Sequence, residues 1–125
     1  MAKFKFIIEK TKTGYSAFEE GHPIFTTGRT MLELQDNCFE ATNLYLEEFK
    51  KSTLKANIVF ELDFKQFFNY YKVINAKHLA ARIGMNESLL SQYVNGKKKP
   101  SKRQVIRIVD GLHEIGRELV DLTLV

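Results

Sequence analysis

The sequence predicts an α+β protein in two parts, a small β-β-β-α-β domain over residues 1–62 and an all-helical domain over residues 63–125. Hydrophobic residues alternate in short β-rich segments of the first part and recur at helical spacing in the second. Charge divides at the same place. Residues 1–62 hold eight Lys or Arg and nine Asp or Glu, whereas residues 63–125 hold eleven and six. A basic part joined to a near-neutral part predicts two different partners, one of them a polyanion.

The bulk composition predicts an ordinary globular protein of the cytoplasm. Of the 125 residues, 44% are hydrophobic and 27% are charged, which is typical of a folded chain. Cys38 has no second cysteine to pair with, which fits a reducing compartment, and its apolar surroundings predict a buried packing role. The N-terminus lacks the apolar segment of a signal peptide, and no apolar run is long enough to span a membrane.

The first part begins with three expected strands. Alternation over Lys3–Lys10 predicts the first, and the turn before Tyr15–Glu19 predicts a hairpin with the second. Ile24–Thr27 predicts a short third strand. A helix then opens at Thr30 in a Thr-x-x-Glu capping box, and its expected apolar stripe is Leu34, Cys38, Ala41, Tyr45 and Phe49.

A fourth strand over Ala56–Leu62 completes a small sheet that one long helix covers on one face. Its acids lie on or beside strands, where glutamates are usually solvated: Glu9, Glu19, Glu20 and Glu61. Metal-dependent hydrolysis needs several converging carboxylates, and no Ser/His/Asp set, phosphate loop or Cys/His spacing is present. We therefore expect no enzyme activity and no cofactor. His22, in a turn before a proline, is expected to be exposed.

The second part predicts four capped helices. Asp63, Asn75, Asn86 and Ser101 each stand where an N-cap is expected, and the last helix runs to about Leu119. The four aromatic residues of the first helix, Phe64, Phe67, Phe68 and Tyr71, have the spacing of a packing face. Residues 120–125 alternate weakly and predict either a strand or a frayed end.

The spacing between the second and third of these helices favours a helix-turn-helix over a merely structural bundle. Two helices that cross steeply need a small residue at their contact, a turn residue that tolerates positive φ, and apolar residues pointing inward. Ala80, Gly84 and Met85 meet these needs at the expected offsets. A cationic stretch follows at once, as expected for DNA binding: Lys97, Lys98, Lys99, Lys102, Arg103 and Arg107.

Residues 76–97, from Ala76-Lys77-His78-Leu79-Ala80 to Tyr93-Val94-Asn95-Gly96-Lys97, resemble the helix-turn-helix domains of phage repressors and Cro proteins. The resemblance implies a recognition helix that begins near Glu87 and exposes Glu87, Ser88, Ser91 and Gln92. It places Gln92 where a base-contacting glutamine occurs, and a glutamine amide can pair with adenine in the major groove. Phosphate contacts are expected from Asn95, Lys97, Lys98, Lys99 and Lys102. Lys77 can touch the backbone too, whereas a half-buried imidazole is expected for His78.

The N-terminal part resembles the HicB antitoxin family. The similar segments are Gly14-Tyr15-Ser16-Ala17, Thr27-Gly28-Arg29-Thr30 and Asn43-Leu44-Tyr45-Leu46-Glu47-Glu48, followed by a final strand. The resemblance implies a degenerate ribonuclease-H-like fold without catalysis. It also implies that the chain masks a small HicA-like ribonuclease toxin and represses their shared operon by binding operator DNA.

One helix-turn-helix unit makes few contacts, so a homodimer that reads a palindrome is expected, with a tetramer left open. The last helix with Ile115 and Leu119 is the candidate dimer surface. The open sheet with Glu19 and Glu20 is the candidate toxin-facing surface, because an acidic rim suits a basic partner.

Two other hypotheses stay open. The chain could be a free-standing transcriptional regulator whose first part senses a ligand or only oligomerises. A toxin-sized reading frame beside the gene would favour the antitoxin instead. A residual nuclease that uses the N-terminal carboxylates is the third hypothesis, and metal-dependent RNA cleavage would support it.

Overall fold

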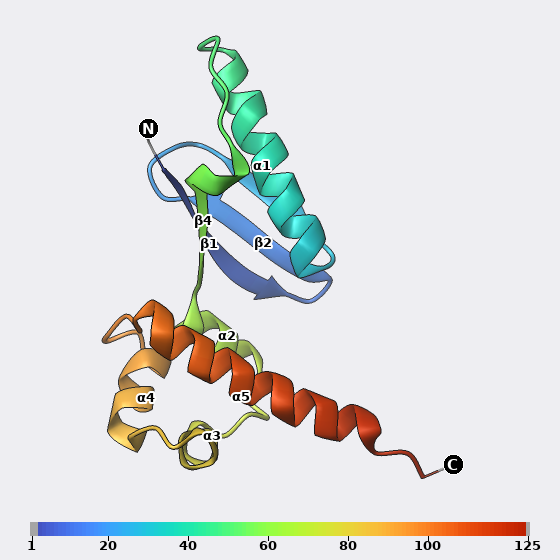
Figure 1. Cartoon of the computed structure of the whole chain (residues 1–125), viewed down its shortest axis with the longest axis vertical. Coiled ribbons are helices and arrows are strands. Elements are labelled where there is room, and N and C mark those ends of the chain that lie inside the picture. Colours follow the sequence, from blue (N-terminus) through green and yellow to red (C-terminus); the bar gives the residue numbers. More distant parts are fainter. Residues whose placement is uncertain (1–2, 125) are drawn as a thin grey trace. The chain divides into compact units, whose positions relative to one another are not determined.

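The computed structural model describes residues 3–124 and confirms a mixed α+β class, with one four-stranded sheet and five α-helices in that range (Figure 1). The chain divides into two compact units, the first ending at Tyr70 and the second beginning at Tyr71. The net charges are −1 for residues 1–70 and +5 for residues 71–125. The charge contrast seen in the sequence is therefore a contrast between two folded units.

The first unit, hereafter the sheet unit, is a sheet covered on one face by a long helix. Its sheet order is β3-β2-β1-β4, in which β1 is antiparallel to β2 and parallel to β4. Its elements are β1 Phe4–Thr11, β2 Gly14–Glu19, β3 Phe25–Gly28, α1 Met31–Glu47, the 3-10 turn η1 Lys55–Asn57, β4 Ile58–Leu62 and α2 Phe64–Tyr70.

Helix α1 begins at the predicted cap, because the Thr30 hydroxyl accepts a hydrogen bond from the backbone N–H of Glu33 at 3.1 Å. Its first turn lies so close to β3 that a Cβ at Gly28 would come within 2.5 Å of the Leu34 backbone. The buried line of α1 is Leu34, Cys38, Thr42 and Leu46. These residues pack on the inward side of the strands, with Phe4, Phe6, Ile8, Ala17 and Ile58.

This buried line differs from the predicted stripe, which continued to Phe49. Helix α1 ends at Glu47, and Phe49 is exposed beyond it. Thr42, a polar residue, is fully buried because its hydroxyl donates to the Cys38 carbonyl one turn earlier, at 2.7 Å. Apolar spacing alone could not distinguish the two lines, since Ala41 and Tyr45 lie beside the buried one and are partly covered.

Helix α2 belongs with the sheet unit, although the sequence-based boundary lies before it. The Gln66 amide accepts from the Lys10 N–H at 2.8 Å and donates to the Lys10 carbonyl at 2.7 Å. The N–H of Asp63 donates to the Ile8 carbonyl, which extends the β1–β4 ladder into the helix cap. A single side chain thus satisfies both backbone groups at the end of β1 and ties α2 to it.

The second unit, hereafter the helical unit, contains α3 Ala76–Ile83, α4 Glu87–Val94 and α5 Lys102–Asp121. The predicted caps are confirmed, since Asn75, Asn86 and Ser101 each accept a backbone hydrogen bond at the start of one of these helices. The buried side chains of the unit are Leu79, Ala80, Met85, Leu90, Tyr93 and Ile108. Because α5 continues to Asp121, the strand that the weak alternation allowed is absent over residues 120–124, and Val125 lies outside the described residues.

Candidate nucleic-acid interface

The turn between α3 and α4 is built on Gly84. Its backbone is left-handed, with φ 67° and ψ 32°, a conformation that glycine adopts without the penalty of a Cβ. The N–H of Gly84 donates to carbonyls in the last turn of α3, and the N–H of Met85 donates to the Ala80 carbonyl at 2.9 Å. These bonds end α3 and set the direction in which the chain enters α4.

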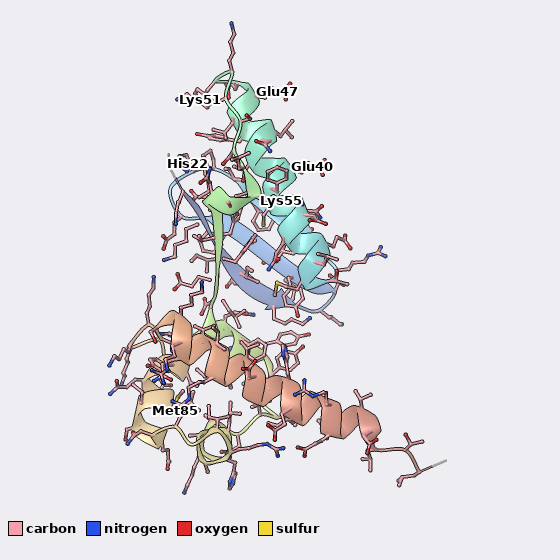
Figure 2. All side chains as sticks on the ribbon, in the orientation of Figure 1. His22, Glu40, Glu47, Lys51, Lys55 and Met85 are labelled. Atoms are coloured by element: carbon pink, nitrogen blue, oxygen red, sulfur yellow. The ribbon has the colours of Figure 1, made fainter. Side chains whose placement is uncertain are left out.

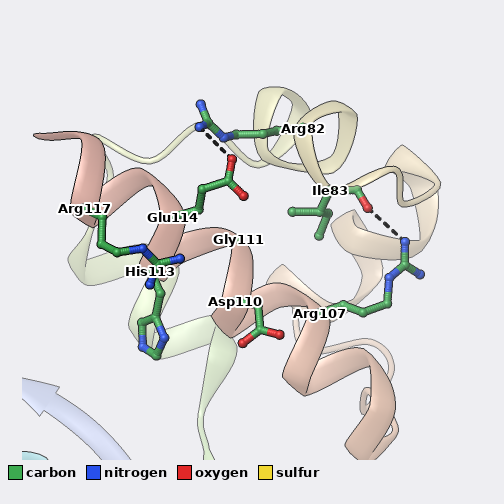
Figure 3. A pocket seen from close by; sticks show the side chains of 8 residues that line it. All are labelled: Arg82, Ile83, Arg107, Asp110, Gly111, His113, Glu114 and Arg117. Carbon is green, nitrogen blue, oxygen red and sulfur yellow. Dashed lines mark hydrogen bonds and ion pairs between the residues drawn. The ribbon is translucent and has the colours of Figure 1, made fainter.

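A side chain of helix α5 donates hydrogen bonds to this turn (Figure 3). The Arg107 guanidinium donates to the carbonyls of Ile83 and Gly84, each at 3.0 Å, and to the Gln104 side chain at 3.1 Å. One turn further on, Gly111 allows α5 to pass close to Ile83, because a Cβ at that position would collide with the Ile83 side chain. Sequence reasoning counted Arg107 as part of the cationic stretch. It did not foresee that the guanidinium turns inward to the two carbonyls that end α3.

Helix α4 has one buried side and one exposed side. Leu90 and Tyr93 face the core of the helical unit, with 0% and 4% of their surfaces exposed. The four residues expected to read bases are all exposed: Glu87, Ser88, Ser91 and Gln92. The cap of α4 is Asn86, whose side chain accepts from the Leu89 N–H at 3.1 Å. Asn86 and not Glu87 therefore caps the helix, and the negative charge of Glu87 is stabilised by the positive N-terminal end of the helix dipole.

The cationic stretch begins at the end of α4. The N–H groups of Lys97 and Lys98 donate to the Gln92 carbonyl at 2.9 and 3.3 Å, which folds the chain back against the helix. The Asn95 side chain donates to the Ser91 hydroxyl at 3.2 Å. All five residues expected to contact phosphates are exposed: Asn95, Lys97, Lys98, Lys99 and Lys102. The predicted base-reading residues thus form an exposed row along α4, and the predicted phosphate-binding residues follow its C-terminal end as far as the start of α5.

Other polar residues of the helical unit are arranged differently. Lys77 and His78, at the start of α3, are both exposed, so the half-buried imidazole predicted for His78 is not found. Arg82 forms ion pairs with Glu114, at 3.1 Å, and with Glu118. It lies with Arg107 and Arg117 around an open pocket of about 440 Å³ between α3 and α5, in which Asp110 and Glu114 balance much of the positive charge (Figure 3).

In the sheet unit, the two acids expected to form a rim are used differently. Glu19 is buried, with 6% of its surface exposed, and its carboxylate accepts from the N–H groups of Lys5 and Gly21 at 2.7 Å each. His22 Nδ1 lies at the same distance. Burial alone would raise the pKa of Glu19, but these contacts outweigh it and hold the pKa below its ordinary value. Only Glu20 is exposed, so the expected acidic rim of Glu19 and Glu20 is corrected to Glu20 alone.

His22 is also less exposed than its turn position predicted. The ring of His22, which is labelled in Figure 2, packs between Phe4 and Tyr45, with its centre 5.1 Å from that of Phe4 and 5.5 Å from that of Tyr45. The turn therefore closes over the edge of the core, with Glu19 beneath it. Cys38 is buried as predicted, and burial raises the pKa of its thiol to about 12, so the thiol stays protonated.

Within residues 3–124, no three His, Cys, Asp or Glu side chains come together as a metal site would require. None of the helices in that range combines the length and apolar character needed to cross a membrane. A comparison with models of known protein families finds no match for the chain, and a comparison with curated proteins finds no significant sequence match.

Proposed function

We propose that the chain is a DNA-binding antitoxin of the HicB type, in which the helical unit is a helix-turn-helix reader of operator DNA. The observation that carries the proposal is the outer surface of α4, where the exposed row Glu87, Ser88, Ser91 and Gln92 is followed in the chain by exposed lysines. Helix α4 is short, polar on its outer side and followed by cations, which suits insertion into a major groove.

These side chains have the hydrogen-bonding groups and charges that a DNA-binding surface needs. Gln92 supplies a donor and an acceptor that suit adenine, while the serine hydroxyls suit either a base edge or a phosphate. Lys97, Lys98 and Lys102 supply charge for phosphates on either side of the groove. The Arg107 bonds to the turn hold α4 in place, so the orientation of the reading face depends on α5.

A two-fold pair of chains is part of the proposal, and the surface of α5 supports it. The apolar residues Ile108, Leu112, Ile115 and Leu119 of α5 and its C-cap Leu122 follow alternate spacings of four and three. Ile108 is fully buried in the helical unit, whereas 65% of Leu119 is exposed. The stripe thus continues beyond the core of its own unit, and a second copy would cover its outer end.

The sheet unit is proposed to mask a small HicA-like ribonuclease toxin, on a degenerate ribonuclease-H-like fold. The near-neutral charge of the sheet unit, beside a basic helical unit, supports a division of labour between a protein partner and DNA. Its sheet has one uncovered face, on which Phe18 and Phe25 are paired neighbours and both exposed. Uncovered apolar residues of this kind are typical of a protein-binding surface.

DNA binding is tested by fluorescence anisotropy with the DNA upstream of the gene and a scrambled duplex of equal length. We expect tighter binding to the upstream DNA, and Gln92→Ala should remove most of that preference. Lys50→Ala serves as control, since Lys50 is an exposed lysine of the sheet unit. Equal binding of both duplexes by the unaltered chain would refute operator recognition.

The antitoxin function is tested by co-expression with any small reading frame beside the gene, followed by purification on a tag carried by this chain. A small protein that co-purifies, and that stops growth when expressed alone, supports the proposal. If the chain binds its upstream DNA but recovers no such protein, the DNA reader stands and the chain is a free-standing regulator.

A further inference from the structure

The sheet has two edge strands, β3 and β4, and they are not equally open. On β3, Thr27 lies opposite Ser16 of β2. The bond from the Glu19 N–H to the Ile24 carbonyl sets the alternation of the ladder, so the backbone groups of Thr27 point away from β2. The Asn37 side chain of α1 donates to the Thr27 carbonyl at 2.8 Å and so covers that edge. Edge strands are commonly protected in this way against pairing with another chain.

The outer side of β4 has a different character. In the parallel β1–β4 pair, the N–H of Asp63 donates to the Ile8 carbonyl, and Leu62 lies opposite Ile8. Alternate residues of a strand turn their backbone groups to the same neighbour. The backbone N–H and C=O groups of Val59 and Glu61 therefore point to β1, whereas those of Phe60 and Leu62 point to the open edge.

An apolar groove lies beside this edge, between β4 and α1. It has a volume of about 330 Å³ and is lined by Leu32, Phe39, Ile58 and Phe60, with Gln35, Asp36 and Lys55. Leu32 is 72% exposed, and the ion pair of Lys55 with Asp36, at 3.6 Å, spans the groove from η1 to α1. A strand added to the edge of β4 would place alternate side chains over this groove.

We propose that a second copy of this chain occupies the edge, with the two β4 strands paired antiparallel about Phe60. The outward backbone groups suit such a pair. The N–H and C=O of Phe60 would bond to those of Phe60 in the second copy, and each Leu62 N–H would reach the Ile58 carbonyl opposite. The remaining outward donor, the N–H of Ile58, already bonds to the Lys55 carbonyl within its own chain.

The side chains agree with self-pairing. Centring the pair on Phe60 places Val59 opposite Glu61 of the second copy, so no like charges face each other directly. The sequence Ile58-Val59-Phe60-Glu61-Leu62 contains neither the proline nor the lysine that usually guards an exposed edge. The two Phe60 side chains would meet on the α1 side of the joined sheet and cover the two grooves.

This pairing goes beyond the proposed function and does not depend on DNA binding. It would join two four-stranded sheets into one, with both α1 helices on the same face. Because it uses the sheet unit, it is separate from the contact proposed for α5. In the proposal the two contacts join different pairs of chains, so both together give a closed assembly of four chains, whereas either alone gives two.

The first test compares the mass of the full chain with that of Phe60→Pro and Phe60→Ala by sedimentation equilibrium. Proline removes the outward N–H of residue 60 without breaking a bond to β1, and proline is tolerated at such edge positions. Alanine removes the same ring but keeps the N–H, so it is the matched control. We expect Phe60→Pro to have half the mass of the unaltered assembly and Phe60→Ala to retain the larger mass at high concentration. An unchanged mass for Phe60→Pro would overturn the proposal.

The second test needs no variant, so it decides the matter even if Phe60→Pro fails to fold. Amide hydrogen exchange is followed in the unaltered chain at high and low protein concentration. We expect the Phe60 and Leu62 N–H groups to be protected at high concentration and to lose protection on dilution. Val59 and Glu61 should stay protected at both. Rapid exchange of Phe60 at every concentration, beside protected Val59, would show that nothing pairs with the edge.

Discussion

The sheet unit and the helical unit contain similar proportions of charged residues, 19 of 70 and 15 of 55, but these residues are placed differently. In the sheet unit, Glu19 is buried under a turn, and Lys5 forms an ion pair with Glu61. In the helical unit, Lys97, Lys98 and Lys102 are all exposed beyond the end of α4. These charged residues of the sheet unit are thus paired within the fold, whereas these lysines of the helical unit are exposed to solvent.

The difference comes from where each fold leaves backbone groups without partners. The turn after β2 leaves N–H groups at Lys5 and Gly21, and a carboxylate satisfies both. The helices satisfy N–H groups at their N-terminal ends with the neutral side chains of Asn75, Asn86 and Ser101, so no carboxylate is needed there. Among the cations, Arg107 is used within the fold, because it donates to carbonyls at the end of α3.

The largest expected effect comes from a substitution in the core of the helical unit, which should leave the sheet unit folded. Leu90 is fully buried in the helical unit, and Leu90→Ala should destabilise that unit by about 2–5 kcal/mol through lost burial and the cavity left behind. Chemical denaturation measures the loss, and amide exchange should show the strands of the sheet unit unchanged. Ile106→Ala, at a half-exposed position on α5, is the control. Equal loss of protection in the strands would contradict two separately stable units.

The next effect concerns the buried carboxylate. Glu19→Gln should destabilise the sheet unit by about 1–3 kcal/mol at neutral pH, because an amide cannot accept from all three donors around it. The folded pKa of Glu19 is lowered, so the carboxylate contributes stability above its ordinary pKa, and this is lost as pH falls through the folded value. Urea denaturation between pH 7 and 3 should show the difference shrinking at acid pH. Exposed Glu20→Gln should change stability by no more than about 0.5 kcal/mol.

The exposed cations should affect binding and leave stability unchanged. Replacing Lys97, Lys98 and Lys102 together by glutamine should weaken binding to any duplex about tenfold or more. Each lost phosphate contact also lowers the slope of log affinity against log salt concentration by about 0.9. Anisotropy titrations at several salt concentrations measure both effects. The matched variant replaces Lys50 and Lys51, exposed lysines of the sheet unit, and should leave both values unchanged.

The smallest effects distinguish two glycines of the helical unit at which a Cβ would meet no neighbouring atom within 4 Å. Gly84→Ala should cost about 1–2 kcal/mol, because its left-handed backbone disfavours any Cβ even though nothing lies within 4 Å of one. Gly116→Ala should instead stabilise α5 by up to about 1 kcal/mol, since it lies in a regular helix and its Cβ also meets nothing within 4 Å. Thermal unfolding measures both. A loss at Gly116 would indicate that another chain packs closely there.

Periodicity and capping predicted most elements of both units within a few residues. Strands β1, β2 and β4 and the caps of α1, α3, α4 and α5 were all read from local patterns. Such patterns succeed because a strand or helix is specified by residues that are near one another in the chain. The exposed row on α4 was expected from the resemblance to repressor and Cro helix-turn-helix domains, and the lysines after it were visible as a run in the sequence.

The remaining features depend on residues far apart in the chain. Gln66 reaches Lys10 across 56 positions and ties α2 to the sheet unit. Arg107 bonds to Ile83 across 24 positions, and no feature of a basic run shows which way a guanidinium turns. Glu19 is buried only because the backbone of Lys5 and the turn at Gly21 meet around it.

The sequence by itself determined which segments form strands and helices, where the helices begin, and that positive charge gathers after α4. Only the tertiary structure decided which charged groups are used within the fold, and that one sheet edge is covered while the other is open. The physical reason is that propensity and periodicity act between neighbours in the chain. Burial and hydrogen bonding at a given atom are set by whichever distant segment packs against it.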